Sequence, residues 1–546
     1  MTPQEICTRH ARNVSDRDAI EWVYRDCYAM TMPIRGARWF TGGTDTSKGS
    51  SELSTSHAVQ AQLLDETGAD GARILGAGLK DGGCPATSRW FGLDVDGVGD
   101  GSKIWLDKSS DRLWRLIHNS NFDAVAFECL VDEVIGGQFV LYVDEDPVEG
   151  GFMFEQWPTA DCTWAQSRQG GPIDMIWREF TITAEQCVTE YPDKAPQAIH
   201  EIAAADGAKP ITMLRYIGPR PGPHGRFALN MPFESVTLIK DTMTKVKESG
   251  YPRFPCVVPR WMTIPGSVYA VGPAYNVLGT MRQLNETIRL QMLGLEVHAG
   301  IGTYKAKDDG VFNPRTVRLG SRRVIIVGDM DNLQPLGQAG DLQATLLDIE
   351  RLQKAIRKGF LADALEPQDT GTKTATEIQV RVDMIRQQLG PMYGRLQAEF
   401  LIPLVELCFA MALDRGAFEP LPQELVRRPF RVKFISPLAR AQQLSEVVAM
   451  DQYVVATAQD ASLDQSVLDN VDLAELNRLR AERLGVPREV LRPREQVRAI
   501  QAQRQRQQAA AQAEALQATA AVASDARQTN TAAAAAGAAR GRMVAA

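Results

Sequence analysis

The residues best suited to chemistry in this chain are a Gly/Lys/Ser loop, six histidines and several paired carboxylates. The loop, GGTDTSKGS at 42–50, has the residue types that bind a nucleotide phosphate. A nucleotide-binding loop needs its lysine directly after the last glycine, at the start of a helix. Here Lys48 precedes Gly49, and no strong strand pattern leads into the segment. An ordinary loop over 41–56 is the better interpretation.

The histidines and carboxylates do not form a known catalytic or metal-binding pattern. No histidine lies in H-E-x-x-H or beside cysteine at the spacing of zinc ligands, and the sequence has no G-x-S-x-G. Asp308-Asp309 and Asp144-Glu145-Asp146 lie in loop-like sequence, where solvated carboxylates are the usual interpretation. We therefore predict that the protein is not an enzyme and has no cofactor and no metal.

Charge and cysteine usage restrict the class of protein further. The net charge is −7, but residues 488–546 hold nine Arg, no Lys and four acids, so residues 1–487 carry −12. An acidic body argues against wrapping nucleic acid, which needs a basic surface. Eight widely spaced cysteines without C-x-x-C favour reduced thiols in the cytosol. The apolar run at 401–413 is too short for a membrane span and contains Glu406, so we expect a soluble, intracellular protein.

The elements that must position any site change in character along the chain. Residues 1–272 alternate between helix and strand patterns, which predicts a mixed α and β region. Residues 273–497 are mostly helical, so the fold class is α+β and predominantly helical. The Ala/Gln-rich remainder, 498–546, has too few large apolar residues to form its own core. Periodicity predicts one or two helices over 3–31. The other helices expected are 58–79, 107–135, 273–295 and 341–360, and the strands expected are SRWFGLDV (88–95), 136–146, DMIWREFTI (174–182), ITMLRYIGP (211–219), 322–329 and 430–439.

One helical stripe continues across two helix breakers. Apolar residues recur every three or four positions over 372–416, although Gly390-Pro391 and Pro403 lie inside the pattern. Proline removes a backbone N–H and clashes with the carbonyl four residues earlier. The unbroken stripe favours one long helix kinked at Gly390 and Pro391, and two helices that meet at Gly390 are the alternative.

Several segments, in order along nearly the whole chain, resemble the portal, or head-to-tail connector, proteins of short-tailed double-stranded DNA bacteriophages. One local departure from the family is Ala270-Val271, where its members often carry Arg or Lys near a turn. The segments that carry the resemblance are DAIEWVYRDCYAMTMP (18–33), LLDETGADGARILGAGL and SRWFGL (63–92), SNFDAVAFECLVDEVIGGQFVLYVDED (120–146), FPCVVPRWMTIPGSVYAVGPAYNVLGTMRQLNETI (254–288), TATEIQVRVDMIRQQLGPMYGRLQAEFLIPLVE (374–406), FISPLARAQQ (434–443) and the Gln/Ala tail.

The resemblance implies the portal fold and its parts. Its subunits would form a ring, expected to be a dodecamer, around a DNA channel. The implied parts are a wing (1–272), stem helix 1 (273–298), a clip (299–340), stem helix 2 (341–361), a tunnel loop (362–373), the kinked long helix and wing return (374–436), a crown (437–497) and the C-terminal tail (498–546), helical barrel or disordered.

The resemblance also suggests which residues meet DNA or partner proteins. An acidic channel wall would let DNA slide, because contacts that release counterions immobilise it. The basic clip residues could meet DNA, the packaging motor or tail adaptors, and a solvated basic face is the alternative. The tunnel-loop candidates are Glu366, Gln368, Asp369, Thr370 and Lys373, and the clip candidates are Lys305, Lys307, Arg315, Arg318, Arg322 and Arg323.

The implied function is a structural portal at one capsid vertex, through which the viral genome is packaged and ejected. Its expected partners are copies of itself, the terminase motor, tail adaptors, the major capsid and scaffolding proteins and the double-stranded DNA, with no membrane. It would reside in the virion, and in the host cytoplasm during assembly. The alternatives are a minor capsid or scaffolding protein without a channel, and a phage DNA-processing enzyme with an unrecognised site.

Overall fold

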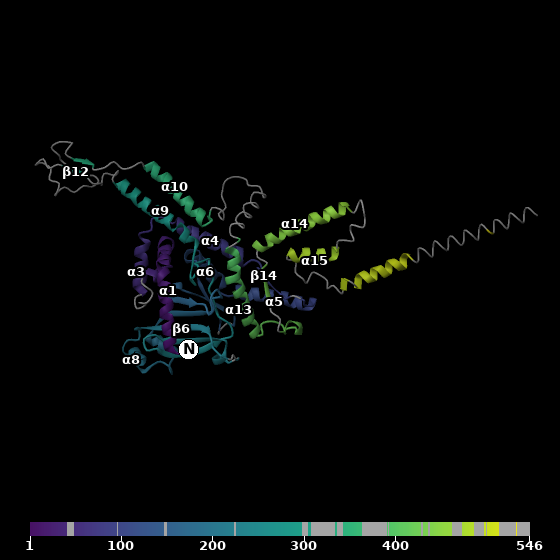
Figure 1. The fold of residues 1–546 in the computed structure, drawn as a ribbon, viewed down its shortest axis with the longest axis horizontal. Coiled ribbons are helices and arrows are strands. Elements are labelled where there is room, and N and C mark those ends of the chain that lie inside the picture. Colours follow the sequence, from purple (N-terminus) through teal and green to yellow (C-terminus); the bar gives the residue numbers. More distant parts are fainter. Residues whose placement is uncertain are drawn as a thin grey trace, which may run out of the picture. The chain divides into compact units, whose positions relative to one another are not determined.

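Five antiparallel strands form the largest sheet of the computed structural model, in the order β4-β5-β6-β7-β8 (Figure 1). A three-stranded sheet, β3-β2-β9, lies in the same part of the chain. The strands predicted at 136–146, 174–182 and 211–219 are confirmed as β2, β5 and β6. Their bounds are β2 Val140–Glu145, β3 Phe152–Trp157, β4 Cys162–Ala165, β5 Met175–Thr183, β6 Pro210–Pro219, β7 Phe233–Ile239, β8 Thr244–Tyr251 and β9 Cys256–Val257.

The chain separates into two units, which are considered one at a time. The first unit comprises 1–93, 109–420 and 431–441, and the second comprises 94–108, 421–430 and 442–546. The residues that the structure describes are 1–40, 49–95, 97–146, 150–222, 225, 227–296, 304–306, 333–335, 342–362, 390, 392–426, 430–434, 437–460, 472–484, 496–497, 499–512 and 531.

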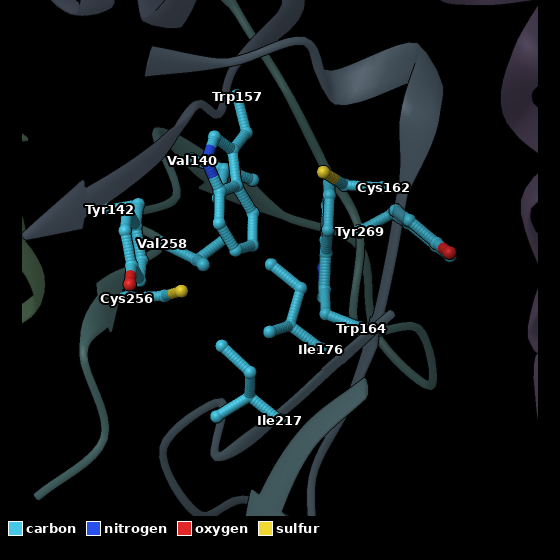
Figure 2. Close-up of a cluster of buried hydrophobic side chains, with 10 residues drawn as sticks. All are labelled: Val140, Tyr142, Trp157, Cys162, Trp164, Ile176, Ile217, Cys256, Val258 and Tyr269. Atoms are coloured by element: carbon cyan, nitrogen blue, oxygen red, sulfur yellow. The ribbon is translucent and has the colours of Figure 1, made fainter. Parts of the chain in front are cut away.

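A hydrophobic cluster joins the two sheets of the first unit (Figure 2). Trp157 at the end of β3 lies in its middle and stacks on Tyr142 of β2 with ring centroids 4.6 Å apart. Trp164 and Ile176 approach from the five-stranded sheet. Because each aromatic ring removes a large apolar area from water, this cluster fixes one sheet against the other.

Arg215 of β6 reaches into the same region from the larger sheet. Its guanidinium donates hydrogen bonds to the hydroxyls of Tyr142, at 2.9 Å, and Tyr251, at 2.7 Å. The same group lies 4.9 Å from the ring centroid of Tyr142 and 5.5 Å from that of Trp157. The cation is thereby held by two hydroxyls and two aromatic faces, contacts that strengthen when water is excluded.

Replacing Arg215 with methionine is expected to lower the free energy of unfolding by about 3 kcal/mol, because charge-assisted hydrogen bonds and cation–π contacts are lost together. Urea unfolding followed by tryptophan fluorescence measures this change. The matched control is Lys245→Met, which removes a half-exposed ion pair with Glu248 and should cost less than about 0.5 kcal/mol. Equal losses in the two variants would contradict the assigned role of Arg215.

The first half of the chain also contains helices, and the first of them begins with a capping box. The Thr2 hydroxyl accepts from the Glu5 N–H, and the Glu5 carboxylate accepts from the Thr2 N–H. Of the one or two helices predicted over 3–31, the structure shows a single one. The helices of the first half are α1 Pro3–Met30, α2 Ala37–Phe40, α3 Gly49–Gln60, α4 Thr67–Gly83, α5 Asp100–His118, α6 Phe122–Gly136, α7 Ala184–Glu190 and α8 Gln197–Ala205.

Two predictions near residue 60 are wrong. Residues 49–56, predicted as loop, belong to α3, and the helix predicted over 58–79 is interrupted before α4 begins at Thr67. One tertiary and one local hydrogen bond hold the interruption: the Leu64 N–H donates to Asn285 of α9 (Pro273–Glu296) at 2.8 Å, and the Thr67 N–H donates to the nearby Asp65 at 2.9 Å. Periodicity alone does not detect a break that a distant side chain stabilises.

The predicted strand pattern at 88–95 yields a short strand that pairs with a late one. β1 (Phe91–Asp94) pairs with β14 (Arg431–Phe434), and Trp90 stacks on Phe434 with centroids 6.3 Å apart. The predicted strand at 430–439 is therefore confirmed in its first half, whereas α14 begins at Pro437. The remaining short strands are β10 Met262–Thr263, β11 Ala270–Val271, β12 Tyr304–Ala306 and β13 Leu333–Pro335.

Ala270-Val271, the local departure from the family pattern, lies in a strand. These two residues form β11, pair with β10 and are buried. The carbonyl of Ala270 accepts a hydrogen bond from the hydroxyl of Tyr24 at 2.8 Å. A small apolar pair suits this position because a charged side chain would be buried there.

A π-turn at Gln397–Leu401 interrupts the long apolar helix Met392–Asp414. The Ile402 N–H donates to the Gln397 carbonyl, five residues back, and the α-helical hydrogen bonding resumes in α13 (Ile402–Asp414). Pro403 follows directly. The wide turn before it leaves space between the proline ring and the carbonyl four residues earlier.

The helix Met392–Asp414 is long and apolar enough to cross a membrane by length and composition, but half of the segment is buried. Phe400 packs edge-to-face on Phe139 at 5.2 Å, as a core helix would.

The second unit is mostly helical in the residues described. It contains α14 (Pro437–Asp460, which starts in the first unit) and α15 (Leu473–Arg483), and Arg480 of α15 pairs with Asp451 of α14.

In the same unit, the Glu424 carboxylate accepts hydrogen bonds from the Gly99 N–H at 3.2 Å and from the Ser102 hydroxyl at 2.8 Å. A carboxylate is favourable here because the first turn of α5 exposes unpaired N–H groups. Residues 499–512 of the tail are helical and largely exposed.

All eight cysteines are free thiols. Seven are buried, and Cys7 alone among the eight is partly exposed. Burial raises the pKa of Cys27 and Cys84 to about 12, so these thiols stay protonated and unreactive.

Candidate assembly interface

An antiparallel pair of helices, α9 (Pro273–Glu296) and α10 (Leu342–Gly359), is the most distinctive surface element of the first unit (Figure 1). Gly359 at the end of α10 lies so close to Val277 that a side chain would not fit there. Apolar periodicity predicted both helices within a few residues, and their existence is confirmed. We call this pair the helix hairpin.

The inner end of the helix hairpin is built into the fold. Met281, Leu284 and Ile356 are buried, and together they line a cavity of about 10 Å³ against α1 and α4, which is too small for a substrate. Asn285 donates to the Gln62 carbonyl at 3.0 Å, and Gln353 donates to Asp65 at 2.8 Å. Apolar packing and these hydrogen bonds therefore fix this end to the interruption between α3 and α4.

The outer end of the helix hairpin exposes large apolar side chains instead. Leu290 is 55% exposed and Leu347 is 68% exposed. Isolated exposed leucines are ordinary on a protein surface, but a group of six on one pair of helices marks an interaction surface. We call this group the leucine patch; its members are Leu290, Met292, Leu293, Leu295, Leu346 and Leu347.

Charges near the leucine patch are compensated within each helix. Arg289 pairs with Glu286 at 2.6 Å, and Arg351 pairs with Asp348 at 2.7 Å, both at a spacing of three residues. The hydrogen bond from Arg289 lowers the pKa of Glu286. Because these charges are already paired within the helix, an apolar partner can cover the patch without leaving any of these charges unpaired.

The structure describes two of the sequence-predicted site residues. Lys305 is the central residue of β12, where its backbone pairs with Gln334 of β13. Gly390 is helical, whereas its neighbour Pro391 lies outside the described residues. The other predicted residues that lie outside them are Lys307, Arg315, Arg318, Arg322 and Arg323 of the clip, and Glu366, Gln368, Asp369, Thr370 and Lys373 of the tunnel loop. The strand predicted at 322–329 also lies outside.

Sequence reasoning missed the contacts that hold the π-turn. Arg260 donates two hydrogen bonds of 2.9 Å to the carboxylate of Glu399, and Arg395 donates to the Trp261 carbonyl at 3.0 Å. Both anchors lie on one short segment next to β10. Their only sequence signal is that single charged residues interrupt apolar runs, which is too common to be diagnostic. In the described part of the chain, no three His, Cys, Asp or Glu side chains gather into a metal site.

Comparisons with known proteins identify the family. The model of the bacteriophage head to tail connecting protein family matches residues 4–491. The chain is 29% identical to a probable portal protein of Bordetella phage BPP-1, over 81% of this chain and 82% of that protein. It is 25% identical to the portal protein of Salmonella phage epsilon15, over 92% of this chain and 91% of that protein.

A similar solved structure is described as the neck of an empty GTA particle computed with C6 symmetry. It is 12% identical with a TM-score of 0.32, over 70% of this chain and 86% of that one. The family model and the two relatives confirm the resemblance found in the sequence. This chain belongs to the bacteriophage head to tail connecting protein family.

Proposed function

We propose that this protein is the structural portal of a phage capsid, a ring at one vertex through which the genome enters and leaves. The observation that carries the proposal is the family match over residues 4–491, together with two relatives that are named portal proteins and align over most of their length. The protein acts by assembly and not by catalysis, in keeping with a family that joins head to tail.

The leucine patch supports a ring of identical subunits. Exposed leucine and methionine side chains on two helices are best covered by the same helices of a neighbouring subunit. In a ring of identical chains, each subunit contributes one side of the interface to each of its two neighbours, so no other protein is needed to cover the patch. The hairpin would be the stem of the portal, with stem helices at 273–298 and 341–361 and the clip at 299–340 between them.

The other parts follow the family's chain order. Residues 1–272 form the wing, 362–373 the tunnel loop, 374–436 the kinked long helix and the return to the wing, 437–497 the crown and 498–546 the tail. The ring is a dodecamer that binds the terminase motor during packaging and tail adaptors afterwards. Capsid and scaffolding proteins surround it, and double-stranded DNA passes through its channel.

Negative-stain electron microscopy of the purified full chain tests this function directly. We expect closed rings with a central hole, and no hydrolysis of ATP by the isolated protein. Helical bundles without a hole would favour a scaffolding or minor capsid protein. Nucleotide turnover or DNA cleavage that co-purifies with the chain would favour a DNA-processing enzyme.

A further inference from the structure

A helical segment of the tail, residues 499–512, carries arginines and no acids (yellow in Figure 1). Its charged residues are Arg504 and Arg506, and both are exposed. The nearest acids in the sequence are Glu495 and Glu514, which lie beyond its two ends. We call residues 499–512 the tail helix. It is positively charged, in contrast to the acidic remainder of the chain.

The composition of the tail helix determines which kind of partner can cover it. From Gln501 to Gln512 it has no apolar side chain larger than alanine, and every residue in this stretch is exposed. An isolated helix of fewer than about 15 residues is marginally stable in water, so a bound partner would stabilise it. An apolar protein surface is a poor partner, because it needs large apolar side chains to bury. The available contacts are those of arginine and glutamine.

The two arginines lie on opposite sides of the tail helix. Each residue of an α-helix is rotated by about 100° from the one before, so Arg504 and Arg506 differ by about 200°. A flat acidic surface on a neighbouring protein meets one side of a helix and reaches one of the two charges. The major groove of double-stranded DNA, about 12 Å wide, admits an α-helix and has a phosphate backbone along each side.

Neither arginine is neutralised by an acid within the described part of the chain. Exposed arginines on other helices are paired, as Arg73 is with Asp70 at 3.6 Å. Arg504 and Arg506 have no such partner among the residues that the structure describes. The planar guanidinium group presents several N–H donors that match the oxygens of a phosphate. Both side chains are therefore available to a polyanion.

We propose that the tail helix binds double-stranded DNA, lying in the major groove with Arg504 against one phosphate backbone and Arg506 against the other. The exposed glutamines add neutral hydrogen bonds to phosphate and sugar oxygens. Such contacts hold the duplex without reading its base sequence. This inference rests on the proposed portal function, which brings DNA to the ring, and it adds a DNA-binding element besides the clip and the tunnel loop.

The salt dependence of DNA binding by the assembled full chain tests this contact. The probe is a fluorescein-labelled duplex, and its anisotropy gives the association constant over a series of salt concentrations. Each phosphate contact adds about 0.9 to the slope of log K against log salt. Arg504→Gln and Arg506→Gln should each lower the slope by about 0.9 for every tail helix that the duplex meets, and the double variant by about 1.8. At about 0.1 M salt the double variant should bind more than about tenfold more weakly than the wild type.

The substitutions leave the fold of the tail helix unchanged, because glutamine and arginine have similar helix propensities. The matched control is Arg73→Gln, which removes an exposed arginine that Asp70 already neutralises. Its slope and affinity should equal those of the wild type.

An unchanged slope in the double variant, or no DNA binding by the wild type, would overturn the proposal. So would a change from one of the two arginines alone, because a groove contacts both sides of the helix. Loss of rings in the double variant with unchanged DNA affinity would assign the arginines to a neighbouring subunit, which also overturns it.

Failure of this inference is distinguishable from failure of the portal assignment, because ring formation is scored separately by microscopy. Closed rings whose DNA binding is the same in all variants would refute the tail contact and leave the portal standing. A wild-type chain that forms no rings would refute the portal, whatever its affinity for DNA.

Discussion

Aspartate in place of Leu290 and Leu347 is expected to abolish ring formation and leave folded monomers. Each substitution puts a charge into a surface that must lose its water when subunits pack, and an unpaired buried charge costs several kcal/mol. Each ring repeats the damage at every interface, so two substitutions per chain suffice to shift assembly to monomers. Size-exclusion chromatography with light scattering gives the oligomeric state, and circular dichroism confirms that the monomer keeps its helices.

The matched control is Leu229→Asp in the turn between β6 and β7. Leu229 is 56% exposed, almost the same as Leu290 at 55%, but it belongs to the short 3-10 helix Ala228–Asn230 and not to the helix hairpin. This variant should form normal rings. Normal rings in the Leu290→Asp, Leu347→Asp protein would show that subunits meet through other surfaces.

Removal of Pro367–Gly371 from the proposed tunnel loop is expected to leave rings intact and to lower the DNA content of particles severely. If the loop projects into the channel as the family resemblance implies, the deletion removes the narrowest gate that retains packaged DNA. Quantification of DNA per purified particle measures the loss, alongside microscopy of the purified ring.

A Gly/Ser segment of the same length at 367–371 distinguishes gating by loop length from gating by side chains. DNA content close to wild type in this replacement would assign the effect to length, and a loss equal to the deletion would assign it to the side chains. If the deletion itself packages and retains DNA normally, the channel is gated by another element.

The long amphipathic helices were predictable from sequence because burial of one face imposes a repeat on it. Val277, Met281 and Leu284 of α9 follow that repeat, and all three are buried. The same repeat continues to Met292 and Leu295, where the side chains are exposed. Periodicity therefore predicts which residues share a face, but it does not show whether that face is covered by this chain or by another.

The π-turn was not predictable from a helical repeat. Leu396, Phe400 and Leu404 are spaced by four each time and are all buried. In a regular α-helix, side chains four residues apart point in directions that shift steadily around the helix axis. The wide π-turn offsets this shift and helps keep these three residues on one side. Glu133 of α6, which is buried, also carried no signal, since one acid within FECLVDEVIG resembles any polar residue of a half-exposed helix. Its burial results from packing against segments more than a hundred residues away.

The candidate site was the least predictable part. A channel is a property of several chains, and the side chains that line it need not pack within one of them. The predicted clip and tunnel-loop residues rest on the family resemblance, since charge and loop position alone do not distinguish a channel wall from a solvated surface.

The single partly exposed thiol gives a means of counting subunits. Because seven of the eight cysteines are buried, a maleimide dye should attach once per chain, at Cys7. Burial raises the pKa of this thiol as well, so labelling will be slow at neutral pH and faster at mildly alkaline pH. The number of photobleaching steps from one labelled particle then equals the number of subunits in it, and twelve steps would identify a dodecamer without an imposed symmetry.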